Sequence, residues 1–260
     1  MFDFTHALLR SPAQSVTEGL RDGDHAGPGY DGVLREHAAY AAALLELGLT
    51  VDILPQLEAY PDSVFVEDPA LVFGNGAILL NPGAPSRAGE VAEIAPELQL
   101  RFERVLTLNE GFVDGGDVLI TPEEVLIGLS ARTDADGAKA LMKALAELGR
   151  KGRVVNTPAG VLHFKTGCGL IDEETVAVIG ELDDAEMFGS LRRVVIPAVE
   201  AAAANLLRIR DTVLVGQGYP KTRELVERHG VTTLPLSVTE IGKIDAGLSC
   251  MSLRWCETRS

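Results

Sequence analysis

The sequence is short of positive charge. Its 260 residues contain 23 Lys and Arg against 38 Asp and Glu, and the formal net charge is −15. Nucleic-acid binding needs cations that displace counterions from phosphates, and anionic membranes attract clusters of basic residues. We therefore expect no nucleic acid and no membrane as a partner, whereas a cationic small molecule suits this charge balance.

Cysteine and long apolar runs are also scarce. The three cysteines have no recurring spacing, so they predict neither a disulfide framework nor a zinc motif. No apolar run reaches the roughly 18 residues of a membrane helix. The first residues, M-F-D-F-T-H-A-L-L-R, lack the basic and apolar regions of a signal peptide. These absences indicate a cytoplasmic protein with reduced thiols.

The sequence also lacks a Pro/Ser-rich linker between domains. Instead, one pattern of elements recurs along the chain. With 46% hydrophobic and 23% charged residues the composition is that of a folded globule. Each unit holds one or two β-type runs, a helical stretch and a short closing β run. The closing runs are 51–55, 104–108, 153–158, 193–197 and 232–236. Their spacing of about 40 to 50 residues is typical of a repeat or propeller architecture.

The other elements of the unit are legible between the closing runs. Apolar residues at helical spacing, followed by glycine, predict helices over 30–47, 136–148 and 222–229. Paired strands are predicted within 64–80, 117–128 and 168–179. Five β-β-α-β units on a circle would surround a central pore, with the helices outside. An open α/β sheet fits the same pattern equally well.

Carboxylates interrupt the first of these paired strands. The segment P-D-S-V-F-V-E-D-P (61–69) carries Asp62, Glu67 and Asp68, the last two inside an apolar run. Burying them is costly unless a cation or hydrogen-bond donors meet them. A simple turn is the alternative interpretation, because Asp-Pro is a common turn dipeptide.

Two further segments carry groups suited to proton transfer. In G-F-V-D-G-G-D (111–117), Asp114 and Asp117 flank two glycines that allow close approach of another group. His163 lies in a predicted strand, V-L-H-F-K-T-G-C-G (161–169). Alone, a glycine turn and a core histidine explain these segments as well.

Arg87, in G-A-P-S-R, and Arg132, in G-L-S-A-R-T, each close a loop after a predicted strand. Arginine suits bidentate capture of a carboxylate, although most exposed loop arginines bind nothing. Cys250 lies in D-A-G-L-S-C-M-S-L-R-W (245–255). Its position alone favours an inert, buried thiol, and Cys168 and Cys256 look inert as well.

Taken together, these residues predict an unusual cysteine enzyme. A thiol with a histidine is the common pairing of nucleophile and base. Nearby carboxylates would repel the oxyanion that forms on an acyl substrate, which argues against a cysteine protease. They suit an electrophile that is itself a cation, such as a guanidinium.

Six motifs in order resemble one known family. They are P-D-S-V-F-V-E-D-P, G-A-P-S-R, D-G-G-D-V-L, G-L-S-A-R-T, L-H-F-K-T and K-I-D-A-G-L-S-C-M-S-L-R. They are similar to those of the dimethylarginine dimethylaminohydrolase family, in the guanidine-modifying or pentein superfamily, and the resemblance spans essentially the whole chain. It implies one catalytic domain over 1–260, folded as a five-bladed α/β propeller of ββαβ modules around a central channel. It implies no metal or organic cofactor, and homodimers are frequent in the family.

The resemblance also implies roles for individual residues. Cys250 matches the nucleophile, His163 the general acid and base, and Asp114 the acidic residue that orients the histidine, where some relatives carry Glu. Glu67 and Asp68 match the pair at the substrate guanidinium. The other substrate contacts it implies are Asp62 for the α-amino group, Arg87 and Arg132 for the α-carboxylate, Leu20 in a mobile lid, and the backbone carbonyl of Ile244.

The activity implied is hydrolysis of Nω-methylated arginine, a cationic guanidino amino acid, to citrulline and dimethylamine or methylamine. An S-alkylthiouronium on Cys250 would be the intermediate. We expect the carboxylates to raise the thiol pKa in the empty site, so that the bound cation favours the thiolate. The alternatives are an arginine deiminase-like guanidine hydrolase and a non-catalytic pentein-fold binding protein.

Overall fold

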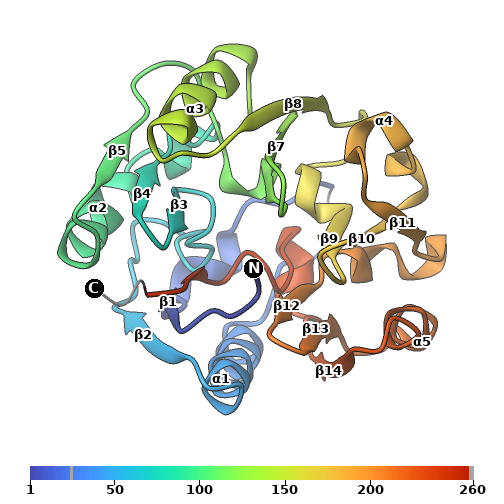
Figure 1. The fold of residues 1–260 in the computed structure, drawn as a ribbon. Coiled ribbons are helices and arrows are strands. Elements are labelled where there is room, and N and C mark those ends of the chain that lie inside the picture. The colour runs from blue at the N-terminus through green and yellow to red at the C-terminus, as the bar shows by residue number, and fades with distance from the viewer. Residues whose placement is uncertain (24–25, 258–260) are drawn as a thin grey trace.

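The computed structural model describes residues 1–23 and 26–257, and in this part of the chain five three-stranded sheets are arranged in a ring. The helices lie on the outside of the ring (Figure 1). This arrangement is the five-bladed α/β propeller, and the open-sheet alternative is wrong.

Each sheet is one module of the ring. In sheet order the strands are β15 (Leu253–Trp255), β1 (His6–Arg10) and β2 (Thr50–Leu54); β3 (Ala70–Phe73), β4 (Gly76–Leu79) and β5 (Val105–Thr107); β6 (Val118–Ile120), β7 (Val125–Leu129) and β8 (Gly152–Asn156); β9 (Cys168–Leu170), β10 (Thr175–Val178) and β11 (Arg192–Val195); β12 (Leu207–Ile209), β13 (Thr212–Gly216) and β14 (Thr232–Leu236). The first strand of each module is antiparallel to the second, and the third is parallel to the second.

A helix connects the second and third strands of each module, as a parallel pair requires. The α-helices are α1 (Tyr30–Glu46), α2 (Glu90–Arg101), α3 (Ala135–Glu147), α4 (Ala185–Phe188) and α5 (Pro220–Glu227). Helix α3 shows why the sequence folds this way. The Asp134 carboxylate accepts a hydrogen bond of 2.7 Å from the Gly137 amide at its start, Leu141 and Leu145 are fully buried, and Gly149 after its end has φ +72.

The hydrophobic core lies between the modules. Among the described residues, each of five buried clusters combines side chains of two adjacent modules. One contains Leu71 and Ile78 of the second module with Val118 and Leu141 of the third. The last strand of the chain, β15, pairs with the first, β1, and so completes the ring.

Two strand predictions are wrong, and both concern site segments. Residues 64–69 form turns, and the paired strand begins only at Ala70. His163 precedes a short 3₁₀ helix, Phe164–Thr166, and the strand there begins at Cys168. The apolar residues at 64–66 and Phe164 are buried because the loops pack into the ring, and these buried positions produced the strand-like pattern.

No helix in the described part of the chain is long and apolar enough to cross a membrane.

Leu141 tests the inter-module core. Its side chain is fully buried in α3, so Leu141→Ala should lower the free energy of unfolding by about 2–5 kcal/mol. The matched control is Leu100→Ala, because Leu100 is 81% exposed on α2, and its effect should stay within about 0.5 kcal/mol. Urea denaturation followed by circular dichroism measures both. Equal stability of the two variants would contradict this location of the core.

Candidate active site

The strand directions bring distant segments to one end of the ring. Because the first two strands of a module are antiparallel, the segment before the first and the segment after the second lie at the same end. Glu67 and Asp68 precede β3, Asp114 precedes β6, His163 precedes β9 and Cys250 precedes β15. The ring therefore collects these five side chains around its axis, although up to 183 positions separate them (250 − 67).

His163 and Asp114 form a hydrogen-bonded pair. The distance between His163 Nε2 and Asp114 Oδ2 is 3.0 Å, and Asp114 is fully buried. Its other oxygen accepts a hydrogen bond of 2.7 Å from the Gly83 amide, which fixes the carboxylate. This geometry suits the orienting role expected for Asp114.

The pKa of His163 is raised to about 9. Burial alone would lower it, but the hydrogen bond to Asp114 and the charges of Asp68 and Asp117 outweigh that effect. Imidazolium is therefore the form of His163 at neutral pH, and it can donate a proton.

Asp68 lies beside this pair. Its carboxylate accepts a hydrogen bond from Arg87 and another of 2.9 Å from the Gly116 amide. One oxygen of Asp68, one of Asp114 and a ring nitrogen of His163 lie within 4.8 Å of one another. Such a group could hold a metal ion, but Asp68 already binds Arg87, and Asp114 already binds His163.

The two glycines near Asp114 allow this packing. A Cβ atom on Gly115 would lie 1.9 Å from the Glu67 carbonyl oxygen, and one on Gly116 would lie 2.9 Å from the His163 ring. The expectation of a close approach at these glycines is confirmed. Any side chain there would push Glu67 or His163 away.

Cys250 faces an anionic environment. Burial raises the pKa of its thiol to about 11, and the charges of Glu67 and Asp68 add to the effect, while Lys165 opposes it. The direction agrees with the expectation from the sequence. The Cys250 carbonyl accepts a hydrogen bond of 3.2 Å from the Glu67 amide, which fixes the two loops together.

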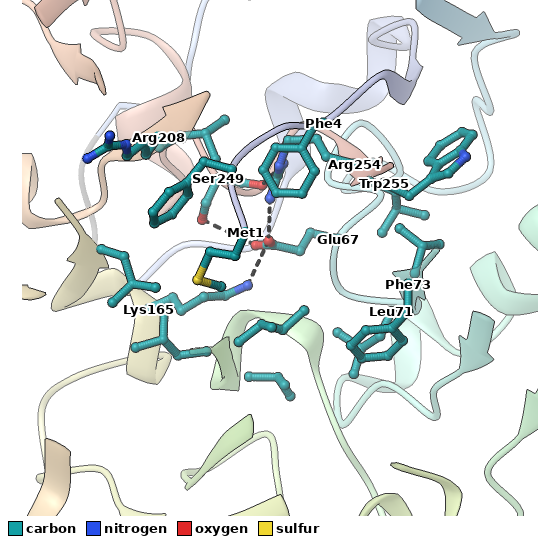
Figure 2. A pocket seen from close by; sticks show the side chains of 18 of the residues that line it. Met1, Phe4, Glu67, Leu71, Phe73, Lys165, Arg208, Ser249, Arg254 and Trp255 are labelled. Carbon is teal, nitrogen blue, oxygen red and sulfur yellow. Dashed lines mark hydrogen bonds and ion pairs between the residues drawn. The ribbon is translucent and has the colours of Figure 1, made fainter. Parts of the chain in front are cut away.

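The Glu67 carboxylate is held by two basic side chains and a serine hydroxyl. Its Oε1 lies 2.6 Å from Lys165 Nζ and 3.2 Å from Arg254 Nη2, and its Oε2 accepts a hydrogen bond of 3.2 Å from Ser249. Figure 2 shows Lys165 and Arg254 pointing at Glu67. This carboxylate is thus fixed by protein partners.

Three of the residues expected around an amino-acid substrate lie close together. Asp62 accepts a hydrogen bond of 3.0 Å from the Leu20 amide. A Cβ atom on Gly19 would lie 3.1 Å from Asp62 Oδ1 and 3.2 Å from Ile244 Cγ2. Leu20, Asp62 and Ile244 therefore lie around one point, and Leu20 is 36% exposed there.

The two arginines differ sharply. Arg87 is 4% exposed and donates to both oxygens of Glu90, to Asp68 and to two backbone carbonyls. Arg132 is partly exposed, and no carboxylate of residues 1–23 or 26–257 forms an ion pair with it. Arg132 is free to bind a carboxylate, whereas Arg87 would have to give up a partner.

Sequence reasoning missed four residues next to the thiol and Glu67. They are Lys165, Asn205, Ser249 and Arg254. Asn205 donates to the Lys165 carbonyl at 3.2 Å and lies 3.9 Å from the Cys250 sulfur. It precedes β12, at the position in its module that the catalytic candidates occupy in theirs. The repeat pattern could have identified it.

Asp114→Asn should lower the pKa of His163, because an amide cannot stabilise the imidazolium as a carboxylate does. A fall of about one unit or more from about 9 is expected. NMR titration of the His163 imidazole, assigned with a His163→Gln variant, measures it. The control is Asp136→Asn, on the exposed start of α3, and an unchanged His163 pKa in Asp114→Asn would contradict the pairing.

Sequence comparisons give a consistent result. A model of the family described as arginine deiminase matches residues 56–192. A dimethylarginine dimethylaminohydrolase from Pseudomonas aeruginosa is 38% identical over 257 residues, covering 97% of this chain and 100% of the relative. Another, from Streptomyces coelicolor, is 31% identical over 252 residues, covering 95% and 96%.

Solved structures agree with this. The P. aeruginosa enzyme, as a mutant complexed with citrulline, superposes with a TM-score of 0.94 at 37% identity, covering 97% of this chain and 100% of that one. The N-terminal domain of ArgZ, a cyanobacterial arginine dihydrolase, has a TM-score of 0.87 at 16% identity, covering 98% of both chains, and so shares the fold. The chain belongs to the dimethylarginine dimethylaminohydrolase family, whose fold is that of the pentein superfamily.

Proposed function

We propose that this enzyme hydrolyses Nω-methylated arginine to citrulline and dimethylamine or methylamine, with Cys250 as the nucleophile. The observation that carries the proposal is the position of the Cys250 thiol beside two buried carboxylates, Glu67 and Asp68, whose charges add to the effect of burial in raising its pKa. A cationic guanidinium complements such a site. Among the relatives, one structure holds citrulline and another an adduct with S-methyl-L-thiocitrulline.

Substrate binding would prepare the nucleophile. The same carboxylates that raise the pKa of Cys250 attract the guanidinium, and the bound positive charge then lowers that pKa. The thiol proton leaves to solvent. The resulting thiolate faces the central guanidinium carbon, which is the electrophile.

Proton transfer by His163 accounts for the remaining steps. A C–S bond forms, the imidazolium protonates the amine nitrogen, and the C–N bond breaks, which leaves an S-alkylthiouronium. Neutral His163 then takes a proton from water, and hydroxide adds to the same carbon. The C–S bond breaks, the sulfur leaves with the hydroxyl proton, and citrulline is released. Asp114 keeps the imidazole in position through the 3.0 Å hydrogen bond.

The amino-acid end of the substrate would contact a separate set of residues. Arg132 is the arginine available for the α-carboxylate, and Asp62 lies where an α-amino group could donate to it. Leu20 would cover the substrate, and the backbone carbonyl of Ile244 is a further acceptor. Arg87 holds Asp68 in place through its hydrogen bond, and its direct contact with the substrate stays a prediction.

Deimination of unmodified arginine is the alternative within this chemistry, and the match to the arginine deiminase model favours it. Comparing citrulline formation from arginine, monomethylarginine and asymmetric dimethylarginine separates the two activities. A non-catalytic binding protein is disfavoured by the retained Cys250 and His163. A cytoplasmic location, a single domain and a homodimer stay predictions, and sedimentation velocity tests the last.

Cys250→Ser should abolish citrulline formation from asymmetric dimethylarginine, because a serine hydroxyl cannot replace the thiolate. A colorimetric citrulline assay measures turnover, and circular dichroism checks the fold. Cys256→Ser is the matched control. Cys256 is exposed and takes part in no step of the proposed mechanism, so this variant should keep wild-type turnover. Residual wild-type turnover in Cys250→Ser would refute the mechanism.

The two arginines should respond differently to substitution. Arg132→Ala should raise KM about tenfold or more, because one charge-assisted contact to the α-carboxylate is lost. Arg87→Ala should lower the free energy of unfolding by about 3–5 kcal/mol, because Asp68 and Glu90 lose their buried partner. Steady-state kinetics and urea denaturation measure the two effects, with Arg192→Ala on the exposed side of β11 as control. An unchanged KM in Arg132→Ala would exclude Arg132 from the substrate site.

A further inference from the structure

A cavity lies inside the ring, where the inner strands of the five modules meet, and Glu67 is one of the residues that line it. Residues of all five inner strands, β3, β6, β9, β12 and β15, line this channel cavity. Its volume is about 400 Å³, which is within the range of about 300–1,000 Å³ typical of small-molecule sites. Cys250, His163 and Asp114 do not line it, although Glu67 does, so the cavity adjoins the proposed active site at Glu67 but does not include the catalytic candidates.

One part of the channel cavity, called its floor here, is formed by Glu67, Lys165 and Arg254 and carries more positive than negative charge. Lys165 and Arg254 both reach Glu67, at 2.6 and 3.2 Å, so two cations share one carboxylate. All three side chains are at least 89% buried, where opposite charges are weakly screened. An ammonium has three N–H donors, and Glu67 is the ion-pair partner of Lys165 in the described chain, so donors of Lys165 remain for a ligand. One further anion would make the cluster neutral.

Two more arginines at other positions of the lining, called the rim here, strengthen this positive field. Arg150 and Arg208 also line the cavity, so the side chains of its described lining include four cations and one carboxylate, in a chain of net charge −15. Figure 2 shows the guanidinium of Arg208 turned away from the centre, and it contributes to the potential rather than to a contact. A concave, low-dielectric site lined by one sign of charge attracts ions of the other sign.

Between floor and rim the walls are apolar. Leucine and aromatic side chains dominate them, and Figure 2 shows Leu71, Phe73 and Trp255 along one side. An apolar wall above a cationic floor requires a ligand with the matching two parts. A small inorganic anion would leave the walls unfilled, and a neutral hydrocarbon would leave the charge of the floor unbalanced.

We propose that the channel cavity binds an elongated apolar molecule with a single carboxylate, whose head group lies at Lys165 and Arg254 and whose apolar body fills the walls. This binding site goes beyond the hydrolysis of a cationic guanidine at the other end of the ring. It takes a ligand of opposite charge, and its occupancy does not depend on turnover.

The single tryptophan of the chain provides a direct readout. Trp255 is the only one in the sequence and it lines the channel cavity, so a ligand there changes its emission. Decanoate, below its micelle concentration and at fixed pH, should give a saturable change. Decan-1-ol, with the same apolar body and no charge, should bind about tenfold more weakly, and decylamine should give no saturable change.

Lys165→Met tests the position of the head group. With Lys165 removed, Glu67 and Arg254 form a neutral pair, so decanoate should lose its roughly tenfold advantage while decan-1-ol binds as before. Lys151→Met is the matched control, because Lys151 is 76% exposed on the outer surface, and it should keep the wild-type preference. The decan-1-ol titration shows in each variant that the cavity is still formed.

The proposal is overturned if decanoate leaves the wild-type Trp255 emission unchanged up to its micelle concentration, or binds no more tightly than decan-1-ol. Both measurements use the wild-type protein and hold even if Lys165→Met fails to fold. An undiminished decanoate preference in a folded Lys165→Met variant overturns the placement of the head group. Neither measurement depends on citrulline formation, so a failure of the proposed hydrolysis would leave the outcome of the binding experiment unchanged.

Discussion

Closure of the ring is the constraint on which the rest of the structure depends. Each three-stranded module buries its apolar side chains against its two neighbours, as the five inter-module clusters show. A module by itself would expose these surfaces to water. Pairing of β15 with β1 completes the last interface. The same closure brings the segments before the inner strands together, so the stability of the fold and the assembly of the site have one cause.

Glu67 lies at the centre of this arrangement, and its negative charge has two effects. Towards the channel cavity it forms ion pairs with Lys165 and Arg254, which compensate the charge of this buried carboxylate. Towards the other end its charge raises the pKa of the Cys250 thiol. The amide of Glu67 also donates to the Cys250 carbonyl. A residue that lines the channel cavity therefore also affects the electrostatics of the Cys250 thiol.

The sequence predicts local elements well and their assembly less well. Helices α1, α3 and α5 and three of the hairpins follow from periodicity and glycine positions, because those signals are local. Periodicity could not separate a ring from an open sheet, since strand order depends on distant pairing; the family resemblance did. Periodicity also gave the wrong structure at 64–69 and at His163, because the loops there contain buried apolar residues in a strand-like pattern. The internal partners of Arg87 and the cations around Glu67 depend on tertiary contacts that no motif encodes.

Burial and nearby carboxylates together account for the raised pKa values of both catalytic candidates. Carboxylates stabilise the imidazolium of His163, whereas burial and the charges of Glu67 and Asp68 destabilise the thiolate of Cys250, so the two pKa values are raised to about 9 and about 11. A cysteine protease instead pairs thiolate with imidazolium before its substrate arrives. In the mechanism proposed here, a neutral electrophile would meet an unreactive thiol, whereas a bound cation would offset the carboxylates and favour the thiolate. In the proposed mechanism, the charge of the substrate would thus contribute to selectivity twice, once in binding and once in activating the sulfur that attacks it.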